Sequence, residues 1–434
     1  SNTVLQGASI LSNLSQVGRA TYNQTFDTGT QFQTSYSTNR SSNNSAFTTF
    51  NPSVTQGLQV QLTQPLLRDR GRGVQRLPFL IAETRLDQTH AQVQQQIIQL
   101  LFQAESAYWE VVSQRENLRV RENNVDVNRA FLERSRRELE LGAISPLDIY
   151  QPEQQFATAQ VAVTQARYRL QQAEDAVRRW IGADLHPDIR NLPLALTESA
   201  EPPTAPPTLD AEQLVETAMG MRPELEVRRQ ALEVDDLSIK QATNLMRPDL
   251  SINGLYSSTG RGGVFYDRSL IDSGGAISVI PGGLGDALSQ LFGFSIPTYS
   301  VGLTLQLPLR NRRAAANLAN ASIQKKRDLF QLRSIEQNIR LDVLQAVAGV
   351  ELSKAAVQQA AVAQDFAQKR LDAEERKYDL GVSTAFFVLA AQDTLVRAEA
   401  DLVDQSIAYR RALLTLDRAT GELLDKRGVQ LRYD

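Results

Sequence analysis

Apolar and polar residues alternate in two stretches of the first half of the chain. The positions between the apolar side chains carry mainly Thr, Ser, Asn and Gln, and a turn-rich tract over residues 39–52 separates the two stretches. We therefore predict a β-hairpin over residues 20–65, with one apolar face and one polar, uncharged face. The apolar positions are Phe26, Phe32, Tyr36, Val54, Leu58, Val60 and Leu62.

The second half repeats this pattern over residues 249–308, where two alternating stretches flank a long Gly- and Ser-rich segment at 260–297. We predict a second β-hairpin with that segment as its loop. A strand with lipid on one side and water on the other has this alternation, and so does a soluble sheet packed on a core. The apolar positions are Leu250, Ile252, Tyr256, Val301, Leu303, Leu305 and Leu307.

After each hairpin the period changes to three or four residues, which predicts long helices. No glycine lies between Gly73 and Leu139, and a helix of that length is a rod of roughly 100 Å. Helices this long are typical of coiled coils. We predict long helical hairpins over residues 73–182 and 313–421.

The two helical hairpins are copies of one another. Gly142 and Gly381 are 239 residues apart, and Gly182 and Gly421 have the same separation, with no insertion between them. An offset that stays constant over this length indicates an internal duplication. Each Leu-Gly pair predicts a left-handed helix end, followed by Ser or Thr as the cap of the next helix and Pro146 in its first turn.

The duplication divides the chain into two repeats, 1–182 and 209–421, joined by a Pro-rich linker at 183–208 and followed by a tail at 422–434. The second repeat opens with a predicted helix pair at 209–246. The first repeat has no matching pair before its hairpin. We therefore expect the natural protein to begin earlier, with a signal peptide and roughly 60–100 further residues.

Composition excludes several kinds of function. The chain of 434 residues has no cysteine and a net charge of −3, which argues against thiol chemistry and against nucleic acid as a partner. His90 and His186 are expected on solvated surface, and we predict no metal, no cofactor and no enzymatic activity. The glycine-rich segments at 261–263 and 281–283 are interpreted as polar surface loop.

Arginines cluster where each predicted strand pair meets its helices. The guanidinium groups suit phosphate headgroups at a membrane interface, although a solvated run of charge has the same composition. The predicted interface residues are Arg68, Arg70, Arg72, Arg310, Arg312 and Arg313.

Four lipid-facing strands leave open edges, and an unpaired edge is very unfavourable in a bilayer. The barrel must then close by self-association, and three copies supply twelve strands. The predicted fold is an α+β membrane protein, in which a trimeric twelve-stranded β-barrel is continued by a long α-helical coiled-coil barrel. A soluble coiled-coil scaffold is the alternative from a different class.

The duplicated arrangement resembles the TolC-like outer-membrane efflux proteins. The segments that carry the resemblance are Gln64–Leu67, Ala107–Trp109, the two Leu-Gly turns with the residues after them, and the ends at residues 180–182 and 419–421. The resemblance implies a homotrimer that spans the outer membrane and extends into the periplasm. It implies a passive exit duct for drugs or other small toxic compounds, served by a periplasmic adaptor and an inner-membrane pump. The exit duct of a type I protein secretion system is the alternative cargo.

The resemblance also implies where the entrance closes. Tyr378 matches the gate tyrosine and Asp148 its partner, so a Tyr378–Asp148 hydrogen bond is expected. Ser383 stands where the family has a gate arginine, and Phe387 occupies one position of an acidic ring. Phe386 or Phe387 is therefore expected to close the pore by dewetting. The tips expected to contact the adaptor are Leu141, Gly142, Ala143, Ser145, Leu380, Gly381, Val382, Ser383 and Thr384.

Overall fold

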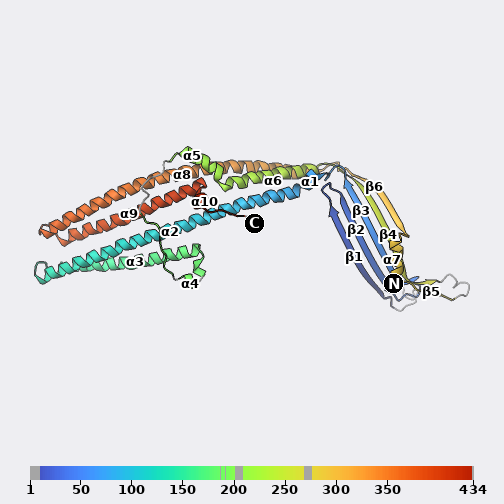
Figure 1. Ribbon diagram of the computed structural model, residues 1–434, viewed down its shortest axis with the longest axis horizontal. Coiled ribbons are helices and arrows are strands. Elements are labelled where there is room, and N and C mark those ends of the chain that lie inside the picture. Colours follow the sequence, from blue (N-terminus) through green and yellow to red (C-terminus); the bar gives the residue numbers. More distant parts are fainter. Residues whose placement is uncertain (1–9, 186, 191, 201–208, 268–275, 433–434) are drawn as a thin grey trace. The chain divides into compact units, whose positions relative to one another are not determined.

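A computed structural model describes residues 10–185, 187–190, 192–200, 209–267 and 276–432 (Figure 1). The chain forms two compact units. The first comprises Ser1–Arg85 and Ala231–Asp328, and the second comprises Leu86–Gln230 and Leu329–Asp434.

The first unit is built on one antiparallel sheet (Figure 1). Strands β1 to β4 lie side by side in sequence order, and β6 pairs with β4 on its other side. The short β5 pairs with the far end of β4, on the same side as β6. The strands are β1 (Asn13–Thr25), β2 (Gln31–Asn43), β3 (Phe50–Pro65), β4 (Asp249–Asp267), β5 (Ser278–Ile280) and β6 (Pro297–Gln306).

The pairing register collects the apolar side chains on one face. Leu62 lies opposite Phe32 of β2, and Ile252 of β4 lies opposite Leu303 of β6. The intervening positions bring Gln33 opposite Gln61 on the other face. Because side chains alternate along a strand, one residue of slip would mix the two faces. The apolar face is well exposed on β6, where Tyr299, Val301, Leu303 and Leu305 are 73%, 84%, 68% and 60% exposed.

The prediction of two strands in the first half is wrong, because the described residues of that half form three. Residues 13–25 form β1, and a tight turn over Phe26–Thr30 leads into β2. Gly29 in this turn has a φ of 90°. The strand escaped prediction because its alternation is weak: Gln16 and Gln24 share a face with Tyr22, and Arg19 lies on the other. The turn tract predicted at 39–52 is also shorter, since β2 continues to Asn43.

The loop predicted at 260–297 is partly strand and partly helix. Strand β4 continues to Asp267, and helix α7 (Leu284–Phe292) packs on the apolar face of β3 and β4. Ala287 and Leu291 of α7 are fully buried, and Ser258 Oγ donates to the Leu291 carbonyl at 3.0 Å. The glycines explain this close packing. A Cβ on Gly260 would lie 1.9 Å from the Ala287 carbonyl oxygen, so only glycine fits there.

The second unit is a layer of helices with several small cores instead of one large core. One buried cluster joins α5, α6, α8 and α9, and another joins α2, α9 and α10. A third joins α8 and α9, and a fourth joins α2 and α3. This pattern fits a thin wall of helices. The main helices are α2 (Leu77–Glu140), α3 (Tyr150–Trp180), α5 (Ala211–Met221), α6 (Pro223–Leu245), α8 (Arg312–Asp379), α9 (Ala385–Thr420) and α10 (Leu423–Lys426).

Short elements complete the chain. Helix α1 (Arg72–Gln75) precedes α2, and the linker contains the 3₁₀ turn η2 (Ala183–Leu185) and α4 (Pro187–Arg190). The linker then runs along α2, where Tyr108 accepts hydrogen bonds from the backbone of Thr197 and Glu198. Its residues 201–208 lie outside the described residues. None of the described helices combines the length and hydropathy needed to cross a membrane.

We predict that Gly260→Ala detaches α7 from the sheet. The added methyl group would overlap the backbone of Ala287, at an expected loss of about 1–3 kcal/mol in α7 docking. Limited proteolysis should then cut within 284–292 faster than in the parent protein. Gly254→Ala is the matched control, because its Cβ would be 4.0 Å from the nearest atom. Equal cleavage rates in both variants would contradict this account of the glycines.

Candidate functional site

The two helical hairpins end in turns with the same hydrogen-bonding pattern. Gly142 N–H donates to Leu139 O at 2.9 Å and Ala143 N–H to Glu138 O at 2.8 Å. At the positions 239 residues later, Gly381 N–H donates to Tyr378 O at 2.9 Å and Val382 N–H to Lys377 O at 3.0 Å. Both glycines are left-handed, with φ of 73° and 76°. This is the Schellman arrangement that satisfies the last carbonyls of a helix.

The returning helices start at different positions. Helix α9 begins at Ala385 directly after Thr384, whereas α3 begins only at Tyr150. The prediction that Pro146 lies in the first turn of α3 is therefore wrong. Asp148 explains the delay: its Oδ2 accepts from the Ser145 N–H at 3.1 Å and closes a separate turn before the helix. Ser145 Oγ also accepts from the backbone of Leu147 within this turn.

The tips present apolar side chains to solvent. Leu141, Leu147, Leu380 and Val382 are 84%, 76%, 79% and 74% exposed. Four such side chains at two equivalent turns form an apolar surface that a partner protein can cover. We call these residues the tip surface.

Tyr378 makes a hydrogen bond that differs from the predicted one. Its hydroxyl donates to Glu138 Oε2 at 2.7 Å, while Asp148 is engaged within its own turn. Arg134 donates to the same carboxylate at 2.8 Å, and its guanidinium lies 5.0 Å from the centre of the Tyr378 ring. Arg134 also pairs with Asp379 at 2.7 Å. The network joins the end of α2 to the end of α8.

This network shifts the pKa of two of its members. Burial raises the pKa of Tyr378 to about 12, and the hydrogen bond to Glu138 and its negative charge act in the same direction. Burial alone would raise the pKa of Glu138, but the hydrogen bonds from Tyr378 and Arg134 outweigh it and hold the pKa below 4.5. At neutral pH the phenol is therefore protonated and donates to a charged carboxylate.

The remaining gate candidates lie at the start of α9. Ser383 Oγ donates to Glu374 Oε2 at 3.1 Å, so it holds the turn to α8. Phe386 and Phe387 are 57% and 53% exposed, and their rings meet edge to face at 5.5 Å. The two rings are available to meet another surface.

The arginine cluster has mixed roles. Arg68 donates to Asp249 at 2.6 Å and joins the end of β3 to the start of β4. Arg313 and Arg68 both line a cavity of about 550 Å³ next to Leu307 and Pro308, below the apolar face of β6. The other predicted interface residues, Arg70, Arg72, Arg310 and Arg312, are exposed.

Sequence inspection missed Glu138 and Arg134. The sequence does indicate an ion pair here, because Arg134 and Glu138 are four residues apart on one helix and carry opposite charge near its end. The duplication places Glu138 opposite Lys377 in the alignment of the repeats, so the carboxylate is specific to the first copy.

A two-faced antiparallel sheet in the first unit and paired long helices with apolar tips in the second unit are the features by which the chain can be assigned to a class of outer-membrane protein. The chain belongs to the outer membrane efflux protein family. The family model matches residues 27–183 and 214–422. The protein is accordingly an outer-membrane protein.

Individual relatives support the assignment. The chain is 24% identical over 334 residues to the outer membrane efflux protein BepC of Brucella suis, a match that covers 76% of this chain and 65% of BepC. The fold is similar to that of VceC from Vibrio cholerae, with a TM-score of 0.67 at 16% identity over 94% of this chain and 87% of VceC. It is also similar to the open MtrE channel of Neisseria gonorrhoeae, with a TM-score of 0.65 at 18% identity over 97% and 82% of the two chains.

We predict that Glu138→Gln loosens the two tips. The substitution weakens the hydrogen bonds from Tyr378 and Arg134, at an expected loss of about 1–2 kcal/mol, so amide exchange near Gly142 should be roughly 5–30 times faster at neutral pH.

The effect should depend on pH. Because the folded pKa of Glu138 lies below 4.5, the stability that its carboxylate contributes is present above that pH and is lost as the pH falls through the folded value. The difference between variant and parent should therefore disappear in acid, after correction for intrinsic exchange. Glu140→Gln, at an exposed position on the same helix, is the control.

Proposed function

We propose that this protein is the outer-membrane duct of a tripartite efflux system. Three copies form a channel, and drugs or other small toxic compounds leave through it passively after an inner-membrane pump and a periplasmic adaptor have delivered them. Membership of the efflux protein family supports this proposal at the level of the class. The cargo and the partners are parts of the proposal.

The two-faced sheet is the observation that carries the proposal. Its apolar face is exposed on β6, whereas the opposite face of β2 and β3 carries Gln, Ser, Thr and Asn. An isolated sheet of this kind leaves apolar side chains in water and strand edges unpaired. Closing the sheet with other copies in a bilayer removes both problems, since lipid covers the apolar face and water fills the polar interior.

The proposed gate lies at the tips of the helical hairpins. Tyr378, Glu138 and Arg134 link the ends of α2 and α8, while Asp148 and Ser383 each hold their own turn. The rings of Phe386 and Phe387 then meet their counterparts from the other copies around the axis. A constriction lined by phenyl rings excludes water without a charged group, so we propose hydrophobic gating at this end.

The tip surface is the proposed adaptor-binding surface. Its apolar side chains are exposed at two turns that share one backbone geometry, so an adaptor with one binding mode can use both turns of each copy. The predicted contact residues at 141–145 and 380–384 all lie in or next to these turns.

We expect the membrane-extracted protein to have the mass of three chains. One chain is 48.2 kDa, so light scattering corrected for bound detergent should give about 145 kDa. A species of that mass that stays in solution only in the presence of detergent would support the proposed trimeric channel. A water-soluble monomer would contradict the proposal and favour the coiled-coil scaffold.

We expect Phe387→Ala to open the closed pore. Removing the ring widens the constriction and lets water remain in it, so single-channel conductance in planar bilayers should rise roughly twofold or more. Phe366→Ala is the control, because Phe366 is also exposed on a long helix but lies more than three turns before the tip. An unchanged conductance in Phe387→Ala, with Phe366→Ala behaving as the parent, would remove the phenyl gate from the proposal.

A further inference from the structure

The number of long strands conflicts with simple closure of a symmetric barrel. The described sheet has five strand positions, β1, β2, β3, β4 and β6, and each neighbouring pair is antiparallel. Strand direction therefore alternates, and β1 and β6 at the two edges run the same way. Copies related by rotation about the barrel axis keep their strand directions. If all five strands stayed in the wall, β6 of one copy would meet β1 of the next in parallel.

Removing β1 from the wall resolves the conflict. Strand β2 runs opposite to β6, so a junction between β6 of one copy and β2 of the next is antiparallel, like every other pair in the sheet. Four strands per copy then give a uniformly antiparallel barrel. The edge of β2 that this junction requires is the edge that β1 covers from Asn13 to Thr25.

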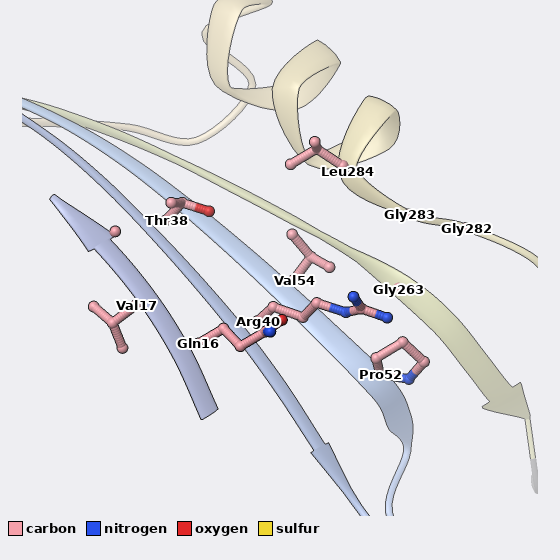
Figure 2. A pocket seen from close by; sticks show the side chains of 11 residues that line it. Gln16, Val17, Thr38, Arg40, Pro52, Val54, Gly263, Gly282, Gly283 and Leu284 are labelled. Carbon is pink, nitrogen blue, oxygen red and sulfur yellow. The ribbon is translucent and has the colours of Figure 1, made fainter. Parts of the chain in front are cut away.

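Strand β1 is attached mainly through its backbone. Every residue of β1 is exposed except Gly18, which is half-buried. Helix α7 stands over β3 and β4, and Figure 2 shows β1 on the far side of a hollow of about 550 Å³ that separates it from Leu284 of α7. Side-chain contacts to β2 are few and polar, such as Ser15 to Asn39 at 3.1 Å, with one edge contact between Tyr22 and Phe32.

Strand β1 is less apolar than β6, the strand that would replace it. The apolar face of β6 carries Tyr299, Val301, Leu303 and Leu305 in succession. The corresponding face of β1 carries Leu14, Ala20 and Tyr22, interrupted by Gln16, Gly18 and Gln24. The match to the family model begins at residue 27, so β1 lies outside the matched residues.

We propose that β1 is an edge guard, which covers the β2 edge in the unassembled chain and is displaced there by β6 of a neighbouring copy. A free strand edge can pair with another chain and aggregate before assembly. With β1 in place the free edge belongs to β1, which carries Arg19, and a charged side chain on an edge strand disfavours such pairing. Exchange replaces one antiparallel ladder with another, so backbone hydrogen bonds are conserved. The gain comes from the neighbour's β6, whose exposed edge becomes paired. This inference rests on the proposed trimeric channel.

A reversible disulfide tests the displacement. Thr21 lies directly opposite Ser35, and the 434-residue sequence has no cysteine, so Thr21→Cys with Ser35→Cys forms a single staple between β1 and β2. Refolding into liposomes under oxidising conditions should reduce the yield of trimer at least roughly tenfold, and reductant should restore it. Tyr22→Cys with Thr34→Cys is a second staple at the next pair, with the other hydrogen-bonding geometry.

The matched control staples two strands that remain together in either case. Gln33 of β2 lies opposite Gln61 of β3, so Gln33→Cys with Gln61→Cys should assemble equally with and without reductant. If both oxidised β1–β2 staples gave trimers in normal yield, the displacement of β1 would be ruled out, and the proposed trimeric channel would be unaffected. Failure of the unaltered chain to form trimers would instead overturn the proposed function.

A crosslink supplies the positive signal. Ser35 of β2 and Thr304 of β6 lie well over about 14 Å apart within one chain, because two strands separate them and Thr304 is six residues beyond Thr298, the β6 residue level with Ser35. That separation is too large for a disulfide. In the exchanged trimer the two strands are neighbours from different copies. A chain with Ser35→Cys and Thr304→Cys should therefore give covalent dimers and trimers with a short bifunctional maleimide. Covalent oligomers from Thr21→Cys with Thr304→Cys, and none from the first pair, would show that β1 stays in the wall.

Discussion

The requirement that every backbone amide find a partner governs the rest of this structure. A bilayer supplies no hydrogen bonds, so the sheet in it must have no free edge. Within one chain, the strands from β1 to β6 pair with one another, but the outer edges of β1 and β6 have no partner strand in the described sheet. In the proposed channel other copies close the sheet, and strand direction then limits which edges can meet. Lipid on one face and water on the other would account for the alternating side chains.

The same requirement applies in the helical unit, where the long helices must turn. Both turns satisfy their last carbonyls through a left-handed glycine, Gly142 in one copy and Gly381 in the other. The backbone solution is therefore shared by the two repeats, while the side chains are not. Glu138 occupies in the first copy the place that Lys377 occupies in the second, and this difference provides an acceptor for Tyr378.

Much of the architecture followed from the sequence because the periodicity is strong. The long helices and the Leu-Gly turns lie where the repeat placed them, since glycine and apolar spacing act locally. Strand β1 was missed because its alternation is weak and its ladder depends on β2, a tertiary interaction. The partner of Tyr378 was missed for a related reason: which carboxylate reaches the phenol depends on how α2 and α8 pack, and Asp148 is held by its own turn.

The duplication also explains why the two repeats tolerate different chemistry. In each copy the hydrogen bonds that form the turn come from the backbone, so side chains at the tips are free to differ without loss of the turn. Asp148 is used in the first copy to close an extra turn, and Ser383 in the second contacts Glu374 across the hairpin. Since the fold does not depend on Phe386 and Phe387 for burial, their exposure requires another cause. In the proposed channel, a constriction that several copies line together would supply that cause, because the phenyl rings would be removed from water there.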